Sequence, residues 1–579
     1  MEILTNSFDE LTVADFFCGA GGFSEGFRQK GFRILFALDS WGPAIETHRL
    51  NHPDCIHLQT DILNVKIEDI DKQIPDTDVI IGSPPCVSFS SSNKAGKADK
   101  ELGIKLIEKF LQIVAIKKFK NNSKLKYWLM ENVPNSKKYL KESYSFSSLG
   151  ITQKNLDNMD INKNYKDIAI SLDFSEGCIY NAVHYGVPQK RKRYICGEHP
   201  SPKIDFPNKE NWKKLKDILN SFRNMDDVVT DILYNFTIQK KHLTDHFYDT
   251  NIHEFDWKLA MIKKQHARYY GKMAFPENEE KPSRTIMATR SMSSRESMII
   301  NNGKPNTYRS LTIREVASIM SFPLTYQFQG KNESTKYKLI GNAVCPKLSA
   351  AFAESILTKE HRDAKDIVFV LPDLNKLQVN LNDNPNNVYI PKSKHPLAQF
   401  AHIVPDLKVK NFRVELDNSF PKKNNGKVVW RASIHHATGK KQMKKSHPKK
   451  QEILGLLKQF RERKKIAEFE MDLYNTFVDK IPNSETFQKL FCTYHDENNF
   501  IAPIDALKKV KELVDKHFPE EQYSDILLNN TTRKKTNFIK FDREISPNNK
   551  IPLRIIMAYI AVNYITKLVK KKNNNISVI

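Results

Sequence analysis

Cysteine is scarce in this sequence and never falls into a recognisable pairing pattern. The 579 residues include 7 cysteines, scattered along the chain, with no CxxC pair among them. A disulfide framework or a thiolate zinc site needs closely spaced cysteines, so we expect neither, and no metal. Scattered thiols are typical of a protein that works in a reducing cytoplasm.

Long apolar runs are also absent. The first ten residues, MEILTNSFDE, are polar and acidic, unlike a secretory signal peptide. The longest late apolar run, Ile555 to Ile565, is too short to cross a bilayer, and we interpret it as a buried helix. We therefore expect a cytoplasmic protein with no membrane partner.

Positive charge, in contrast, is abundant. Lysine and arginine number 91 against 67 aspartates and glutamates, which gives a formal net charge of +24. This excess favours a polyanionic partner, with nucleic acid the first choice and an anionic membrane surface the second. The length is too great for one ordinary core and predicts two to four domains.

Strand-like and helix-like segments alternate from Leu11 to about Pro200. FRILFALD has the composition of a buried strand, and KELGIKLIEKFLQIVAIKKF has apolar residues at helical spacing. This rhythm predicts an α/β fold with a mostly parallel sheet covered by helices on both faces. Ligands of such sheets bind beyond the carboxyl ends of the strands, which is where the candidate functional residues lie.

The stretch DFFCGAGGFSEGF places Gly19, Gly21 and Gly22 between a strand and a helix. A tight turn alone could explain these glycines, but the next two strands end in acids, Asp39 and Asp61. A carboxylate after the second strand commonly binds ribose hydroxyls. Because no Walker lysine follows, a nucleoside with little phosphate, such as S-adenosylmethionine, fits better than a triphosphate.

The stretch SPPCVSFS presents a thiol, Cys86, directly after two prolines at the end of another strand. A thiolate is a strong nucleophile when its pKa is lowered or a proton acceptor is near. Glu131 ends a hydrophobic strand, where desolvation lets a carboxyl hold and donate a proton. Arg191 and Arg193 alternate in PQKRKRY and suit a phosphate or a base carbonyl. An inert loop cysteine and a solvated basic run are the alternatives.

Taken in order, these motifs resemble the DNA (cytosine-5)-methyltransferases of bacterial restriction-modification systems. The likeness covers about Leu11 to Leu357 and rests on six motifs: DFFCGAGGFSEGF, SPPCVSFS, ENV, NAVHYGVPQKRKRYICG, RSLTIREVASIMSFP and YKLIGNAVCPKLSAA. The resemblance implies a Rossmann-like methyltransferase domain. It also implies methylation of C5 of cytosine within a specific duplex DNA sequence, with S-adenosylmethionine consumed to S-adenosylhomocysteine.

The same resemblance implies roles for the site residues. Cys86 would attack C6 of a cytosine flipped out of the duplex, and Glu131 would hold and protonate N3. Arg193 would contact the flipped base or its phosphate, and Arg191 would support the loop. The implied cofactor pocket consists of Phe17, Gly19, Gly21, Asp39, Trp41, Asp61, Pro84, Asn342 and Val344.

Three positions depart from the usual pattern of that family. Val87 stands where most members have glutamine after the catalytic cysteine. Asp39 replaces the usual glutamate, and Cys18 replaces a more common alanine or serine. None of these changes removes the nucleophile or the acid.

The resemblance also implies a domain order. Residues 1–198 and 309–358 would form the catalytic domain, and residues 199–308 would form a target-recognition domain. The implied DNA contacts are Ser88, Ser90, Arg284, Arg290 and Arg295. Arginine can bind guanine O6 and N7 bidentately, although plain surface charge is the alternative for each arginine.

Residues 359–579 extend beyond the last motif, with strand-like pieces followed by helical ones and several basic clusters. Aromatic residues such as Trp430, Phe460 and Phe469 interleave with these clusters. We interpret this segment as a basic α+β extension that binds the DNA backbone or serves a structural or dimerisation role. A fused nuclease is a third possibility, but we find no carboxylate set or HNH-like histidine array in the sequence.

Two other functions stay open for the whole chain. One is methylation of cytosine in RNA, and the other is a catalytically silent DNA-binding regulator. The set of Cys86, Glu131 and Arg193 argues against a silent regulator, since a binder needs no thiol. The expected partners are double-stranded DNA, bound by a monomer, and a cognate restriction endonuclease that is paired in function. The source would be bacterial or phage-borne.

Overall fold

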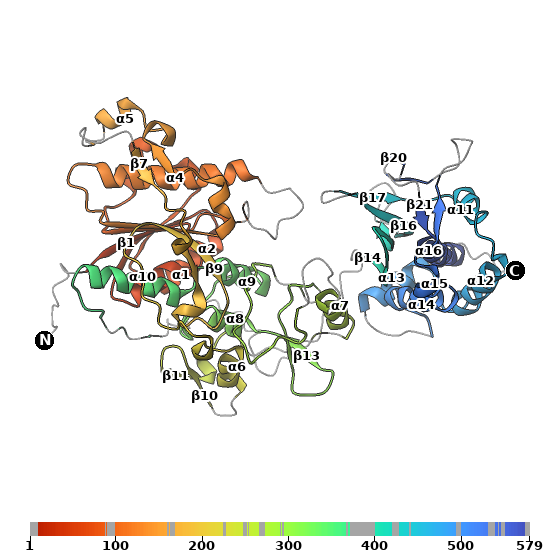
Figure 1. The fold of residues 1–579 in the computed structure, drawn as a ribbon. Coiled ribbons are helices and arrows are strands. Elements are labelled where there is room, and N and C mark those ends of the chain that lie inside the picture. Colours follow the sequence, from red (N-terminus) through yellow and green to blue (C-terminus); the bar gives the residue numbers. More distant parts are fainter. Residues whose placement is uncertain are drawn as a thin grey trace. The chain divides into compact units, whose positions relative to one another are not determined.

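The structure is a computed structural model. It describes residues 10–86, 89, 99–158, 161, 168–223, 227–246, 252, 254–265, 273–289, 291, 294–365, 367, 369–370, 400–419, 428–438, 442–493, 499–530, 539–541, 544–545 and 550–573. The chain divides into two compact units, Met1–Ile390 and Pro391–Ile579 (Figure 1). Each unit is described by itself.

A seven-stranded sheet forms the centre of the first unit. Its first five strands are parallel, and the last two, β9 and β8, run antiparallel to their neighbours. The strands, in spatial order, are β3 (Ile56–Gln59), β2 (Arg33–Asp39), β1 (Thr12–Phe16), β4 (Val79–Gly82), β5 (Tyr127–Asn132), β9 (Lys192–Glu198) and β8 (Ile179–Asn181). The predicted α/β fold with a mostly parallel sheet is confirmed.

Helices cover both faces of this sheet, as Figure 1 shows for α4 (Lys100–Phe119) on one face and α1 (Gly22–Arg28) and α10 (Pro346–Lys359) on the other. The alternation along β1 explains the two layers. Val13 belongs to the core on the α1 and α10 side, whereas Phe16 belongs to the core on the α4 side. Strands buried on both faces have continuous apolar sequences, and this pattern predicts them from the sequence.

The last helices of the first unit, α9 (Glu333–Asn342) and α10, pack against elements from the start of the chain. Helix α9 stops three residues before α10, because Pro346 disfavours helical geometry in the residue before it and starts a new helix. Helix α10 then packs closely on α1. A Cβ on Gly22 would overlap the Val344 carbonyl oxygen. Beyond α10, Lys365 Nζ lies 2.9 Å from Glu10 Oε1, so these two distant residues meet.

Short elements fill residues 199–308. They are α6 (Leu215–Arg223), the hairpin β10 (Val228–Asp231) and β11 (Phe236–Gln239), α7 (Glu254–Gln265), and the hairpin β12 (Ile299–Asn301) and β13 (Tyr308–Ser310). The apolar face of α6 joins the main core of the first unit, whereas Trp257 of α7 packs in a small separate cluster. The boundaries of a recognition domain here stay a prediction.

The second unit is built on a four-stranded antiparallel meander. The strands are β14 (Ala401–Val409), β15 (Phe412–Ser419), β16 (Val429–Thr438) and β17 (Gln442–Ser446). Helix α16 (Leu553–Asn573) packs on the sheet and also on α14 (Pro503–His517). The apolar run from Ile555 to Ile565 lies in α16 and is mostly buried, so its interpretation as a buried helix is confirmed. Across the described residues, no helix is long and apolar enough to cross a membrane.

Candidate active site

The cysteine loop leaves β4 and is held to the strands on both sides. The Ser83 backbone N–H donates to the Phe16 carbonyl at 3.1 Å, and the Asn132 side chain donates to the Pro84 carbonyl at 3.1 Å. These bonds tie the loop to the carboxyl ends of β1 and β5. Cys86 is partly exposed there. Val87, Ser88 and Ser90 lie outside the described residues.

Glu131 and Arg193 form a buried ion pair next to this loop. Arg193 Nε lies 2.7 Å from Glu131 Oε1, because β9 runs antiparallel to β5 and sets the two side chains together. Burial raises the pKa of the Glu131 carboxyl, and the charges of Arg193 and Arg191 oppose that rise. A carboxyl whose pKa is raised by burial can hold a proton and then donate it, which a general acid requires.

The thiol of Cys86 is influenced by the same groups. Burial raises its pKa, the negative charge of Glu131 raises it further, and Arg193 and Arg191 lower it. A neutral Glu131 would exert no such Coulombic effect, and the arginines would then favour the thiolate. Protonation of Glu131 and ionisation of Cys86 are therefore coupled through their charges.

Arg191 is directed into the protein. Its guanidinium donates to three backbone carbonyls, those of Ile286 at 3.1 Å, Gly341 at 2.9 Å and Ala343 at 3.0 Å. Burial lowers its pKa to about 10. Arg191 therefore joins the start of β9 to the end of α9, and its role in supporting the catalytic loop stays a prediction.

The predicted cofactor residues gather at the carboxyl ends of the first strands. The Asp39 carboxylate accepts from the Gly19 N–H at 2.9 Å and the Trp41 N–H at 2.8 Å, so it fixes the glycine loop to the end of β2. Asp61 caps a short helix by accepting from the Leu63 N–H at 3.0 Å, and it is exposed.

The late motif reaches the same place. Lys338 on α9 lies 4.5 Å from the centre of the Trp41 ring, which brings this helix alongside the predicted pocket. At its end, Asn342 is exposed and Val344 is buried. The structure therefore brings the early and late cofactor motifs together at one edge of the sheet.

The glycines of the loop have two different environments. A Cβ on Gly19 would have no atom nearer than 3.9 Å, so this position, with φ +53°, opens onto space beside Phe17. A Cβ on Gly21 would overlap the Tyr326 hydroxyl. Packing against Tyr326 therefore also requires a glycine at this position, and the approach of Gly21 to the cofactor stays a prediction.

Two of the three candidate DNA-reading arginines contact acidic residues of their own segment. The Arg284 guanidinium contacts the carboxylates of Glu277 and Glu296 and the backbone carbonyls of Glu296 and Ser297, so it holds its own segment together. Arg295 lies 3.3 Å from Glu296. Arg290 lies outside the described residues. Their contact with DNA stays a prediction.

A buried polar chain that sequence reasoning missed runs behind the glycine loop. The Ser24 hydroxyl donates to Asp15 Oδ2 at 2.6 Å, and His48 Nε2 lies 3.0 Å from the same hydroxyl. Burial raises the pKa of Asp15 to about 7. These residues lie on three different elements, so no spacing in the sequence indicates that they meet.

Comparison with known proteins identifies a matching family and several similar proteins. A family model described as C-5 cytosine-specific DNA methylase matches residues 11–358. The type II methyltransferase M1.HphI of Haemophilus parahaemolyticus is 27% identical over 363 residues, which cover 60% of this chain and 87% of that protein. M.HgiDI of Herpetosiphon aurantiacus is 31% identical over 356 residues, 60% of this chain and 94% of that protein. The solved Entamoeba histolytica methyltransferase EhMeth is 17% identical, covers 61% of this chain and 99% of its own, and has a TM-score of 0.37.

Proposed function

From the premise that this chain belongs to the C-5 cytosine-specific DNA methylase family, and so transfers a methyl group from S-adenosylmethionine to cytosine in DNA, we propose a covalent mechanism at Cys86. The reaction would occur on one cytosine within a specific duplex sequence. The observation that carries the proposal is the buried Glu131–Arg193 pair beside a partly exposed thiol. A silent DNA-binding protein has no need for such a set.

The edge of the sheet fits the cofactor. Gly19 opens onto space, and the Asp39 carboxylate at the end of β2 accepts from the backbone N–H groups of both Gly19 and Trp41. We propose that Phe17, Gly19, Gly21, Asp39, Trp41, Asp61, Pro84, Asn342 and Val344 surround S-adenosylmethionine. When bound, the cofactor supplies an electrophilic methyl group.

The residues of the chain would then act in sequence on a flipped cytosine, since C5 and C6 are inaccessible inside the duplex. Protonated Glu131 hydrogen-bonds to N3, which makes the ring a better acceptor and removes a negative charge near Cys86. The Cys86 thiolate adds to C6, and C5 takes the methyl group. A solvent base then takes the C5 proton, the electrons of that C–H bond re-form the C5–C6 double bond, and Cys86 leaves C6 as the thiolate. Arg193 holds Glu131 and the base in place.

The rest of the chain would supply recognition. We propose that residues 199–308 read the target sequence, and that the basic extension adds contacts to the DNA backbone. Several relatives are named type II methyltransferases. We therefore propose that this chain is the modification enzyme of a restriction-modification system, functionally paired with an endonuclease.

Radiolabelled methyl transfer to duplex DNA, with transfer RNA as a parallel substrate, tests the proposal. We expect label in DNA only, and bisulfite sequencing of DNA from expressing cells should place the mark in one fixed context. Label in transfer RNA would favour the RNA alternative, and cofactor binding without transfer to either substrate would favour the silent regulator. Duplex DNA with 5-fluorocytosine at the target should trap a denaturant-resistant adduct with Cys86, because fluorine cannot leave as the C5 proton does.

A further inference from the structure

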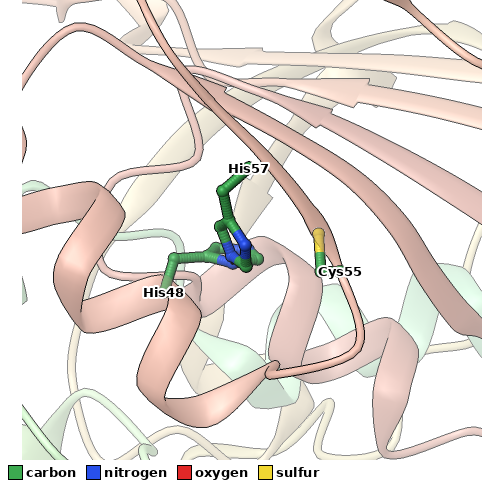
Figure 2. A group of neighbouring side chains, drawn as sticks. All are labelled: His48, Cys55 and His57. Atoms are coloured by element: carbon green, nitrogen blue, oxygen red, sulfur yellow. The ribbon is translucent and has the colours of Figure 1, made fainter.

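Two histidines and one cysteine near the proposed cofactor site lie close enough together to hold a metal ion. His48 lies near the end of α2 (Gly42–Asn51), Cys55 lies in the following turn, and His57 lies on β3. Figure 2 shows the two imidazole rings meeting between the helix and the strand, with the Cys55 sulfur beside them. One potential ligand atom from each residue lies within 4.8 Å of the other two.

The hydrogen bonds around His48 determine which ring nitrogen carries the proton. The other nitrogen has a lone pair, which is directed at the cluster. The single proton of the Ser24 hydroxyl is donated to Asp15, so Ser24 accepts from His48 Nε2. The ring proton of neutral His48 therefore lies on Nε2, and Nδ1 carries a lone pair. That Nδ1 lies 2.9 Å from His57 Nε2. Metal-binding histidines are commonly oriented by such an outer hydrogen bond.

We propose that His48 Nδ1, Cys55 Sγ and His57 Nε2 bind one Zn²⁺ ion. Two imidazoles and one thiolate are a common zinc donor set, and a water reaching the site past half-buried His57 would complete a tetrahedron. With zinc–nitrogen bonds of about 2.0–2.1 Å, the two ligand nitrogens need to move apart by roughly 0.4 Å from their present separation.

Binding of Zn²⁺ at this site requires only two protons to move. The Cys55 thiol loses one proton to solvent, and the His57 ring moves its proton from Nε2 to Nδ1. The Cys55 backbone interacts with the His57 ring in the sense that favours a ring proton, so it offers an acceptor for the proton on Nδ1. Because the sequence has no CxxC pair, a zinc site was not expected, and these ligands are spaced His-x6-Cys-x-His instead.

The ion would connect the end of α2 to the start of β3. Trp41 immediately precedes α2, and Asp61 follows β3 by two residues, so the ion would brace two elements that carry proposed cofactor contacts. None of the three ligands belongs to the proposed catalytic set. The metal proposal therefore stands or falls independently of methyl transfer.

The test uses the full-length, untagged protein after removal of metal with a chelator. Titration with Zn²⁺ should show one tight site per chain, and Co²⁺ should give a thiolate charge-transfer absorption. Cys55→Ser should abolish that absorption, and both Cys55→Ser and His57→Gln should weaken Zn²⁺ binding at least about 10-fold. Zinc should raise the Tm of the unaltered protein by more than that of either variant.

Two matched variants show whether another thiol is responsible. Cys178→Ser removes a different buried free cysteine, and Cys86→Ser removes a partly exposed one. Both should keep the full Co²⁺ signal. Binding that survives Cys55→Ser and His57→Gln, or a folded protein that binds no Zn²⁺, would overturn the proposal and leave a buried histidine pair. If Cys55→Ser does not fold, the half-buried His57→Gln decides the question.

Discussion

Residues 391–579 carry 37 lysines and arginines against 20 acids, a net charge of +17, whereas residues 1–390 carry 54 against 47, a net charge of +7. The longer unit contains all the residues matched by the methylase family model, which ends at residue 358. Its key charges, Glu131 and Arg193, are buried and paired. Under the proposed function, the reaction would use a few desolvated charges of the first unit, whereas DNA affinity would depend on the many basic residues of the second.

The largest expected effect comes from the thiol of the first unit. Cys86→Ser should lower methyl transfer at least about 1,000-fold, because a serine hydroxyl is a far weaker nucleophile at neutral pH. DNA affinity should change little, since the second unit is untouched. Cys178→Ser is the control, and transfer at the normal rate by Cys86→Ser would refute the covalent mechanism.

Removing the acid should have the next largest effect. Glu131→Gln should lower the rate about 100-fold, because an amide cannot donate a proton to N3 as an acid does. Burial raises the pKa of Glu131, so its protonated fraction falls as pH rises through that value. The unaltered enzyme should therefore lose kcat on the alkaline side, and Glu131→Gln should lack that decline. A pH–rate profile of the two proteins measures this, and identical profiles would contradict the assignment.

A change confined to the second unit should affect its stability and leave catalysis intact. Glu415 Oε1 lies 2.7 Å from Lys445 Nζ and 3.3 Å from His435 Nε2. Burial would raise the pKa of Glu415, but these partners outweigh it and lower the pKa to about 2. Glu415→Gln should cost about 2 kcal/mol of unfolding free energy at pH 7.

The sign of the pH dependence follows from the lowered pKa. The stabilisation by Glu415 is present above the ordinary carboxyl pKa and is lost as pH falls toward 2. The stability difference between Glu415→Gln and the unaltered protein should therefore shrink below about pH 4.5. Denaturant unfolding at several pH values measures it, and a difference that grows on acidification would show that the ion pairs do not set the effect.

The smallest effect is expected from the basic end of α16. Replacing Lys570, Lys571 and Lys572 with glutamine should weaken DNA binding about tenfold at low salt and reduce the salt slope by up to about 3. The methylated sequence context should not change. A matched triple change of Lys508, Lys509 and Lys511 on α14, whose lysines pair with nearby acids, is the control. Equal slopes for both variants would favour a structural role for the extension.

Much of the fold could be predicted from local pattern, because buried parallel strands and amphipathic helices differ in their apolar spacing. The reversed direction of β9 could not, since strand direction depends on how distant segments connect. The Glu131–Arg193 pair follows from that reversal. Likewise, the sequence placed Gly21 in a loop but could not show that Tyr326, some 300 residues away, would occupy the space beside it.

Sequence reasoning gives its most definite site prediction where one short motif carries one role, as with Cys86. It missed the cluster of His48, Cys55 and His57 because a helix end, a turn and a strand bring them together without a familiar spacing. The same limit applies to Arg191. Alternation with Arg193 predicted two arginines on one side, and the carbonyls that Arg191 binds come from segments about 100 and 150 residues later.

The ion pair between Glu10 and Lys365 has a consequence for how this chain can be rearranged. Since this ion pair brings residue 10 close to residue 365, a short linker could join the two positions and the first unit could be opened at a surface loop instead. Such a circular permutant should keep the sheet and the site.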